Sequence, residues 1–266
     1  MKTLFIIPLA MKETDGQLFL EDIPVKSLIT EYGTPTFIYS SRTIEENFNK
    51  YKNEIRDDDL ICYAVKANSN LHILKLLISL GSGFDVVSGN ELKKCLIAGA
   101  DKKKIVFSGV AKSIEEIKFA IENDILSINV ESVGEFKRII QISEELNKAV
   151  NCALRINPDI STGSHEYIET GKKTSKFGLD SQAIRTISEL AMKSELTKIT
   201  TIASHIGSQI SDESLILNSL DSMMDVAEEL SQIGHHIENL DIGGGLGIKY
   251  KDENEGDPKT LIDKVK

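Results

Sequence analysis

The chain has 266 residues, of which 41% are hydrophobic and 27% are charged, so it is long enough to bury a substantial core. Its formal net charge of -10 at pH 7 argues against nucleic-acid and anionic-membrane partners, because phosphate binding requires clustered Lys and Arg. Three cysteines, Cys62, Cys95 and Cys152, lie far apart in apolar runs, which predicts free thiols in a cytoplasmic protein.

The first 40 residues differ in pattern from the rest of the chain. The apolar run 4–9 is short and interrupted by Pro8, so it predicts neither a signal peptide nor a membrane span. A strand over 18–20, a helix over 24–32 and a strand over 36–39 are expected to follow. This lead-in is compatible with a second, smaller β-domain.

From residue 60 onward, short runs rich in Val, Ile and Phe alternate with longer amphipathic stretches. Such nearly continuous apolar runs are typical of parallel strands that are covered on both faces. The predicted strands are 60–65, 84–87, 105–107, 127–130, 152–156, 199–204 and 237–242. The predicted helices are 71–80, 114–121, 132–146, 181–193 and 212–233, and Ser113 opens the second of them with a capping-box pattern.

Seven strand-then-helix units in a row predict a parallel sheet. The sheet can be an open doubly wound one or an eight-stranded (β/α) barrel, and the regular spacing and the count of seven favour the barrel. No eighth strand is visible in the sequence. The tail 249–266 is charged and ends inside a predicted helix, so we expect the chain to be truncated at its C-terminus.

In a barrel, polar residues at the C-terminal ends of the strands converge on one rim. This rule places there Lys66, Asp85, Ser108, Asn129, Glu131, Arg155, His205, Asp241 and the glycines 243–245. A lysine in a pocket that excludes water can act as a nucleophile and form a Schiff base. A lysine snorkelling from a strand end is the ordinary alternative for Lys66, and spacing alone favours that alternative.

Gly243, Gly244 and Gly245 follow the last predicted strand. Without side chains, their backbone N–H groups can approach an anion closely, which is typical of a phosphate site. The spacing does not fit a dinucleotide-binding Gly-x-Gly-x-x-Gly motif, and a flexible turn stays open as an alternative. Ser208 can offer a hydroxyl to the same phosphate. His205 can stack on a ring, act as a general acid or be a core histidine.

Two other kinds of chemistry are not supported by the sequence. His235 and His236 are adjacent, so their side chains point in different directions, and no acidic residue lies near them at ligand spacing. We therefore predict no metal site. Serine hydrolysis is excluded because no Gly-x-Ser-x-Gly elbow follows a predicted strand.

Taken together, the motifs resemble the fold-type-III pyridoxal-phosphate-dependent decarboxylases, and most closely the diaminopimelate decarboxylases. They lie in order between about residues 20 and 250. The matching stretches are 63–69 (YAVKANS), 83–92 (GFDVVSGNEL), 107–113 (FSGVAKS), 128–132 (INVES), 154–160 (LRINPDI), 170–179 (TGKKTSKFGL), 204–210 (SHIGSQI) and 240–250 (LDIGGGLGIKY).

The resemblance implies a (β/α)8 TIM-type barrel over 41–266, of the alanine-racemase type. Residues 1–40 would contribute to a β-domain built from both chain ends. The implied cofactor is pyridoxal 5'-phosphate, held through a Schiff base by Lys66, with His205 stacked on its ring as the second catalytic residue. Asp85 and Arg155 would lie near the cofactor. Ser208 and the glycines Gly243, Gly244 and Gly245 would bind its phosphate.

The implied reaction is decarboxylation of meso-2,6-diaminopimelate to L-lysine and carbon dioxide, in a homodimer with shared active sites. Alternatives are a related decarboxylase acting on ornithine, lysine or carboxynorspermidine, and an inactive truncated barrel that only binds cofactor. The chain departs from the family at Ala203, where a second histidine is usual. It also lacks the Glu-Pro-Gly-Arg stretch and the Cys-Glu pair, so we expect little activity from this chain alone.

Overall fold

The computed structural model describes residues 10–158, 177–249 and 256–266. Several stretches of the sequence therefore lie wholly or partly outside the described residues. They are the apolar run 4–9, the last two residues of the motif 154–160, most of the motif 170–179, the last residue of the motif 240–250 and part of the tail 249–266.

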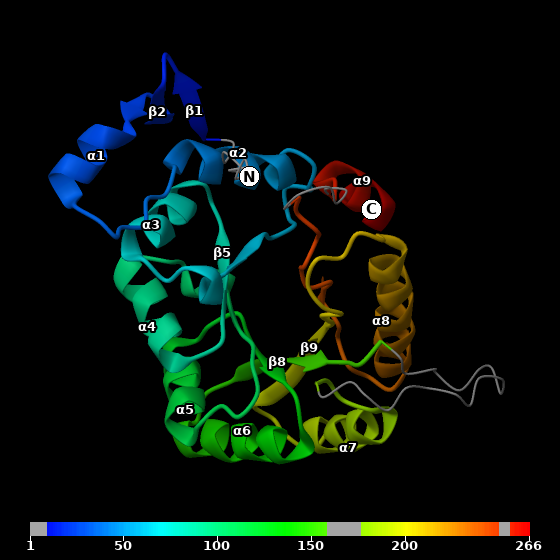
Figure 1. The fold of residues 1–266 in the computed structure, drawn as a ribbon. Coiled ribbons are helices and arrows are strands. Elements are labelled where there is room, and N and C mark those ends of the chain that lie inside the picture. The colour runs from blue at the N-terminus through cyan, green and yellow to red at the C-terminus, as the bar shows by residue number, and fades with distance from the viewer. Residues whose placement is uncertain (1–9, 159–176, 250–255) are drawn as a thin grey trace.

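Seven parallel strands form one sheet that curls around the interior of the molecule (Figure 1). The strands are β4 (Cys62–Ala64), β5 (Gly83–Val86), β6 (Ile105–Phe107), β7 (Ser127–Val130), β8 (Val150–Arg155), β9 (Thr197–Ala203) and β10 (Asn239–Asp241). Each strand pairs with its neighbour in the chain, from β4 at one edge to β10 at the other. A doubly wound sheet reverses its order at a switch point, so the sequential order confirms the predicted barrel-type sheet.

Helices lie on the outer face of the curled sheet (Figure 1). They are α2 (Ser41–Lys52), α3 (Leu71–Ser79), α4 (Gly89–Ala98), α5 (Ile114–Asn123), α6 (Val133–Leu146), α7 (Ser181–Ala191), α8 (Ser214–Gln232) and α9 (Pro258–Val265). Fully buried side chains of the strands, such as Phe84 and Phe107, pack with helix residues such as Leu74 and Phe136 in one core. This burial on both sides explains the apolar strand runs. Among the residues described, no helix is long and apolar enough to cross a membrane.

Three consecutive helices, α4, α5 and α6, begin with the same Ser-x-x-Glu pattern. In each, the serine Oγ accepts a hydrogen bond of 3.2 Å from the glutamate N–H, in the pairs Ser88–Glu91, Ser113–Glu116 and Ser132–Glu135. Each glutamate carboxylate also accepts from a backbone N–H just before its helix, those of Val87, Ser113 and Glu131. These bonds satisfy N–H groups that a helix start leaves unpaired, and they fix the three starts at the C-terminal end of the sheet.

The N-terminal segment forms a separate antiparallel sheet of β1 (Met11–Thr14), β2 (Gln17–Leu20) and β3 (Ile23–Pro24), followed by α1 (Val25–Tyr32). The strand expected over 18–20 and the helix over 24–32 are confirmed, but the strand predicted over 36–39 is wrong. That stretch pairs with no described strand, and the side chain of Phe37 is 89% exposed. Without a partner its backbone groups have no ladder to join.

Candidate cofactor site

The predicted site residues all lie at the C-terminal end of the curled sheet. Asp85 is in β5 and Arg155 is the last residue of β8. His205 follows β9 by two residues, and Gly243 follows β10 by two. Because the strands are parallel, these ends share one rim, as the barrel rule predicts.

Lys66 lies beyond the first strand rather than at its end. Strand β4 stops at Ala64, and Lys66 belongs to a short 3-10 helix, η1 (Val65–Ala67), where its side chain is exposed. The pocket excluding water that we expected around this lysine is therefore not formed by the described residues, because the helical turn carries Lys66 to the open mouth of the sheet. Its charge still acts on both Asp85 and His205 across the rim.

Asp85 is a half-buried carboxyl group with a raised pKa. Burial raises its pKa to about 6, a hydrogen bond from Ser108 opposes this rise, and the carboxylate of Asp241 adds to it. The positive charge of Lys66 lowers the pKa in turn. The Oδ1 atom of Asp85 is buried and has no hydrogen-bond partner in the described part of the chain. This orphaned acceptor is a place where a bound ligand can donate a hydrogen bond.

His205 and Asp241 lie on the same rim, and the charge of each affects the pKa of the other. Burial lowers the pKa of His205, and the positive charges of Lys66 and Arg155 lower it further. The imidazole is therefore mostly neutral at neutral pH. Burial raises the pKa of Asp241, while a 2.9 Å hydrogen bond from the Gly243 N–H to its Oδ1 opposes that rise. The sequence placed Asp241 on the rim but gave it no role.

The glycine run is built for close backbone approach. Gly243 and Gly245 have φ of 73° and 99°, which disfavours any side chain. A Cβ on Gly243 would collide with the Ser204 carbonyl oxygen, and one on Gly245 would collide with the Gly207 carbonyl oxygen. Nothing lies within 4 Å of a Cβ built on Gly244, so that residue faces open space.

The loop that holds Ser208 runs beside the glycine loop. The Ile210 N–H donates to the Gly245 carbonyl at 2.8 Å, and the Gly247 N–H donates to the Ile210 carbonyl at 2.9 Å. Exposed Ser208 is thereby held near the glycines, as the sequence suggested. Small residues, a hydroxyl and open space at one rim suit a phosphate group, and the orphaned Asp85 acceptor suits a polar ring atom. The described residues fit pyridoxal phosphate.

Arg155 and Glu131 form an ion pair on the rim. Arg155 Nη1 donates to Glu131 Oε1 at 2.6 Å, and these side chains are 15% and 5% exposed. The guanidinium also lies 5.2 Å from the ring centre of Phe177, within cation–π range. The end-of-strand rule placed Glu131 on the rim without saying what it binds.

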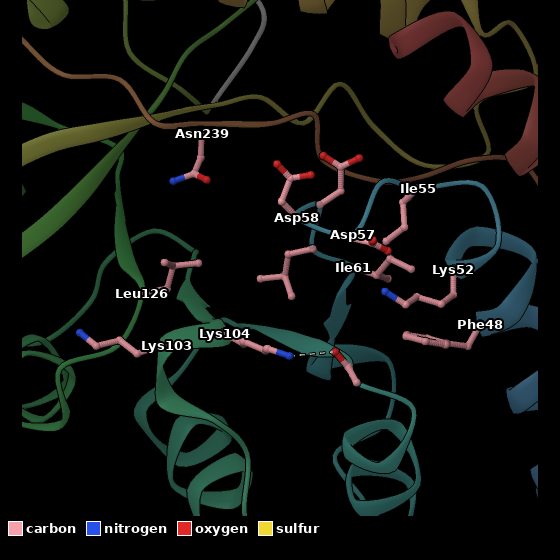
Figure 2. Close-up of a pocket in the computed structure, with 13 residues that line it drawn as sticks. Phe48, Lys52, Ile55, Asp57, Asp58, Ile61, Lys103, Lys104, Leu126 and Asn239 are labelled. Atoms are coloured by element: carbon pink, nitrogen blue, oxygen red, sulfur yellow. Dashed lines mark hydrogen bonds between the residues drawn. The ribbon is translucent and has the colours of Figure 1, made fainter.

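Two features lie away from this rim. His235 shares a 2.7 Å hydrogen bond with Ser188 Oγ, which is an ordinary structural role. A pocket of about 300 Å³ is lined by residues that precede the strands, among them Ile61, Lys104 and Leu126 (Figure 2). It therefore lies at the N-terminal end of the sheet, whereas enzymes with barrels of this kind place their chemistry at the other end.

A curled parallel sheet with a lysine and a glycine loop on its C-terminal rim defines a TIM-type, cofactor-binding barrel. The chain belongs to the pyridoxal-dependent decarboxylase family, because residues 41–265 match the sequence model of its pyridoxal binding domain. The cofactor of this family is pyridoxal phosphate.

Curated relatives and solved structures agree with this assignment. The chain is 42% identical over 256 residues to a diaminopimelate decarboxylase of Haemophilus influenzae, covering 94% of the chain and 62% of the relative. It is 44% identical to that of Aquifex aeolicus, covering 95% of the chain and 60% of the relative. A solved diaminopimelate decarboxylase of Helicobacter pylori in complex with L-lysine has a TM-score of 0.83 at 37% identity, covering 91% of this chain and 61% of that one. The chain thus spans about 60% of its relatives' length.

Proposed function

We propose that this chain forms the cofactor-binding barrel of an enzyme that decarboxylates meso-2,6-diaminopimelate to L-lysine and carbon dioxide. The observation that carries the proposal is the identity of 40 to 44% to diaminopimelate decarboxylases over at least 94% of the chain. Solved lysine/ornithine and arginine decarboxylases are 17 to 22% identical and support the fold alone. L-lysine, the expected product, is bound in three of the related structures.

The roles proposed for the residues follow their positions. Lys66 would hold the cofactor covalently through its amine, and Ser208 with Gly243, Gly244 and Gly245 would bind the phosphate. Neutral His205 would stack on the ring, where an uncharged face is an advantage. When bound, pyridoxal phosphate supplies an electron sink for the electron pair that departing carbon dioxide leaves behind.

The remaining rim residues would orient and tune the site. Asp85 offers a buried acceptor to the polar edge of the ring. Arg155, held by Glu131, keeps a positive charge close to His205 and Asp241. Preorganised charges of this kind stabilise charge that develops during a reaction without needing to rearrange.

The covalent link to Lys66 is tested directly by borohydride. The folded chain is incubated with pyridoxal phosphate and reduced, and the adduct is located by peptide mass spectrometry. We expect one adduct on the peptide that contains Lys66, because this exposed amine acts on Asp85 and His205 at the candidate site. Lys66→Ala should abolish the adduct, while Lys103→Ala, at the opposite end of the sheet, should leave it unchanged. A folded wild type without an adduct at Lys66 would contradict the proposal.

We further propose that the enzyme is a cytoplasmic homodimer and that residues 1–40 belong to a second β-domain. Three free cysteines support a reducing compartment. The separate sheet β1–β3 supports a second domain, and the exposed Tyr32, Phe37 and Tyr39 offer apolar surface against which further residues of that domain could pack. Light scattering of a protein of the relatives' length tests the dimer, and a monomer at micromolar concentration would argue against it.

A further inference from the structure

Lys112 is a buried lysine next to the candidate site, and it has no role in the cofactor binding proposed for the rim residues. Its side chain is 1% exposed, and that of Glu135, its ion-pair partner, is 3% exposed. Lys112 Nζ donates to the Gly109 carbonyl at 2.6 Å, to the Asn129 carbonyl at 2.6 Å and to Glu135 Oε1 at 3.1 Å. All three ammonium hydrogens therefore have acceptors.

Stability alone is a weak reason for this arrangement. Taking two charges out of water is unfavourable, and a well-packed apolar pair of similar volume often gives equal or greater stability. What the ion pair adds is a fixed geometry between neighbouring segments. It joins the loop after β6, the end of β7 and the first turn of α6 at defined points.

The contacts of Lys112 continue to the rim through Glu135. The second carboxylate oxygen of Glu135 accepts the Glu131 N–H at 2.8 Å, which fixes the backbone that carries Glu131. The Glu131 side chain then accepts from Arg155 Nη1 at 2.6 Å. Four residues from three neighbouring βα units are thus joined in series from the buried ammonium to the guanidinium.

A second branch starts from the same ammonium. The Asn129 backbone carbonyl accepts from Lys112, and the Asn129 Nδ2 donates to Ser108 Oγ at 2.9 Å. Ser108 in turn hydrogen-bonds Asp85, so the lysine also braces the strand end beside the second candidate cofactor contact. Lys112 itself touches neither Asp85 nor Arg155 by any of these bonds.

We propose that Lys112 is a positioning residue for Arg155, acting through Glu135 and Glu131. The inference rests on the proposed cofactor site, because Arg155 matters only if a ligand binds at this rim. Lys112 makes no contact with the ligand. It keeps the Glu131 carboxylate in the one orientation in which it holds the guanidinium over the site.

A double-mutant cycle on pyridoxal phosphate affinity tests this inference. The dissociation constant is measured for the wild type, Lys112→Met, Arg155→Met and the double variant, with urea unfolding of each at the same temperature. We expect Lys112→Met to weaken binding roughly tenfold, the loss typical of a charge-assisted hydrogen bond. In the Arg155→Met background the same change should add nothing, because residues that act as a unit are not additive. Additive losses would overturn the inference.

A second readout does not require the cofactor. The Nε–H signal of Arg155 in ¹⁵N NMR should be sharp in the wild type and broadened by exchange in Lys112→Met. Glu131→Gln, which keeps the side-chain volume and removes the negative charge that holds the guanidinium, should broaden it as well and serves if Lys112→Met does not fold. The matched control is Lys103→Met, which removes an exposed lysine paired with Asp124 at 2.6 Å at the other end of the sheet.

The outcomes separate the two proposals. If the folded wild type binds no pyridoxal phosphate, the proposed function fails, and the NMR signal still tests the link from Lys112 to Arg155. If the wild type binds but Lys112→Met only unfolds at lower urea, with unchanged affinity and a sharp Arg155 signal, the lysine is merely structural and the inference is overturned. Unchanged affinity in Lys103→Met is expected in either case.

Discussion

At the scale of single residues, the rim combines groups whose charge states depend on one another. Asp85 and Asp241 are both carboxyl groups with pKa values raised by burial, and each also feels charged neighbours on the rim. Lys66 and Arg155 supply the opposite charge and depress the pKa of His205. The rim therefore holds a neutral imidazole between charged groups. The protonation states of these rim residues should change with pH below neutrality.

The raised pKa of Asp85 predicts how the free energy of unfolding of the cofactor-free protein depends on pH. Its folded pKa of about 6 lies above its usual value of 3.8, so the folded state binds a proton more tightly than the unfolded state. The resulting stabilisation is complete below about pH 4 and is lost as the pH rises through about 6, up to about 3 kcal/mol in total. Relative to the wild type, Asp85→Asn should therefore gain stability between pH 4 and pH 7.

Urea unfolding of both proteins across that pH range measures the difference. Asp59→Asn is a suitable control, because Arg56 lowers the pKa of Asp59, so the contribution of Asp59 to stability is already present above about pH 4 and should stay nearly constant across this range. Stability curves of wild type and Asp85→Asn that run parallel from pH 4 to pH 7 would contradict the predicted shift.

At the scale of elements, the starts of α4 and α5 are fastened to each other. Glu116 accepts the N–H of Gly89 at 2.7 Å through Oε1 and that of Ser113 at 3.0 Å through Oε2. One carboxylate thus caps its own helix and the preceding helix. These two hydrogen bonds are the main reason that the pKa of Glu116 is lowered.

Truncating this carboxylate should be costly for a surface residue. We expect Glu116→Ala to lose about 2 kcal/mol of unfolding free energy, because two backbone N–H groups lose a charged acceptor. Glu115→Ala is the matched control, since Glu115 lies exposed in the same first turn and should change stability by less than about 0.5 kcal/mol. Equal losses in the two variants, measured by urea unfolding at pH 7, would show that Glu116 does not link the helices.

At the scale of the whole molecule, the curled sheet has two edges. In the described residues β4 and β10 each pair with one strand only, and Leu240 in β10 is 39% exposed. An unpaired strand edge offers a row of backbone donors and acceptors to another chain. The chain by itself should therefore associate at high concentration.

A charge on the β10 edge should suppress that association. We expect Leu240→Lys to remain monodisperse in light scattering at concentrations where the wild type forms larger species, because a lysine on an edge strand disfavours strand pairing. Ile97→Lys changes a more exposed apolar residue, 61% accessible on α4, away from any strand edge. It should behave like the wild type. A wild type that stays monodisperse at all concentrations would refute the prediction.

The sequence pattern predicted the sheet well because its strands are buried on both faces. All seven predicted strands are present, with ends that differ by up to two residues. Helix α4 was not predicted, because only Leu92 and Cys95 in it are buried and it opens with Gly89 and Asn90. The strand expected over 36–39 failed for the opposite reason, since an apolar stretch was present without a partner.

The sequence predicted which strand ends carry the residues of the candidate site, but not the hydrogen bonds and ion pairs that join those residues. The rim rule needs only the parallel order of the strands, so it placed Asp85, Arg155 and His205 correctly on one side. It could not find the contact of Lys112 with Glu135, 23 residues apart, because Lys112 follows a loop in which Gly109 and Ala111 have left-handed backbone conformations. The exposure of Lys66 likewise depends on a 3-10 turn that no spacing revealed.

The two loops on the phosphate side, 204–210 and 243–247, have one further consequence. Their backbones are hydrogen-bonded to each other in fixed register, and Gly243 and Gly245 leave no room between them. Neither loop can gain or lose a residue without displacing the other. During evolution they should therefore change length only together, and an engineer who builds chimeras from related barrels would have to transplant them as a pair.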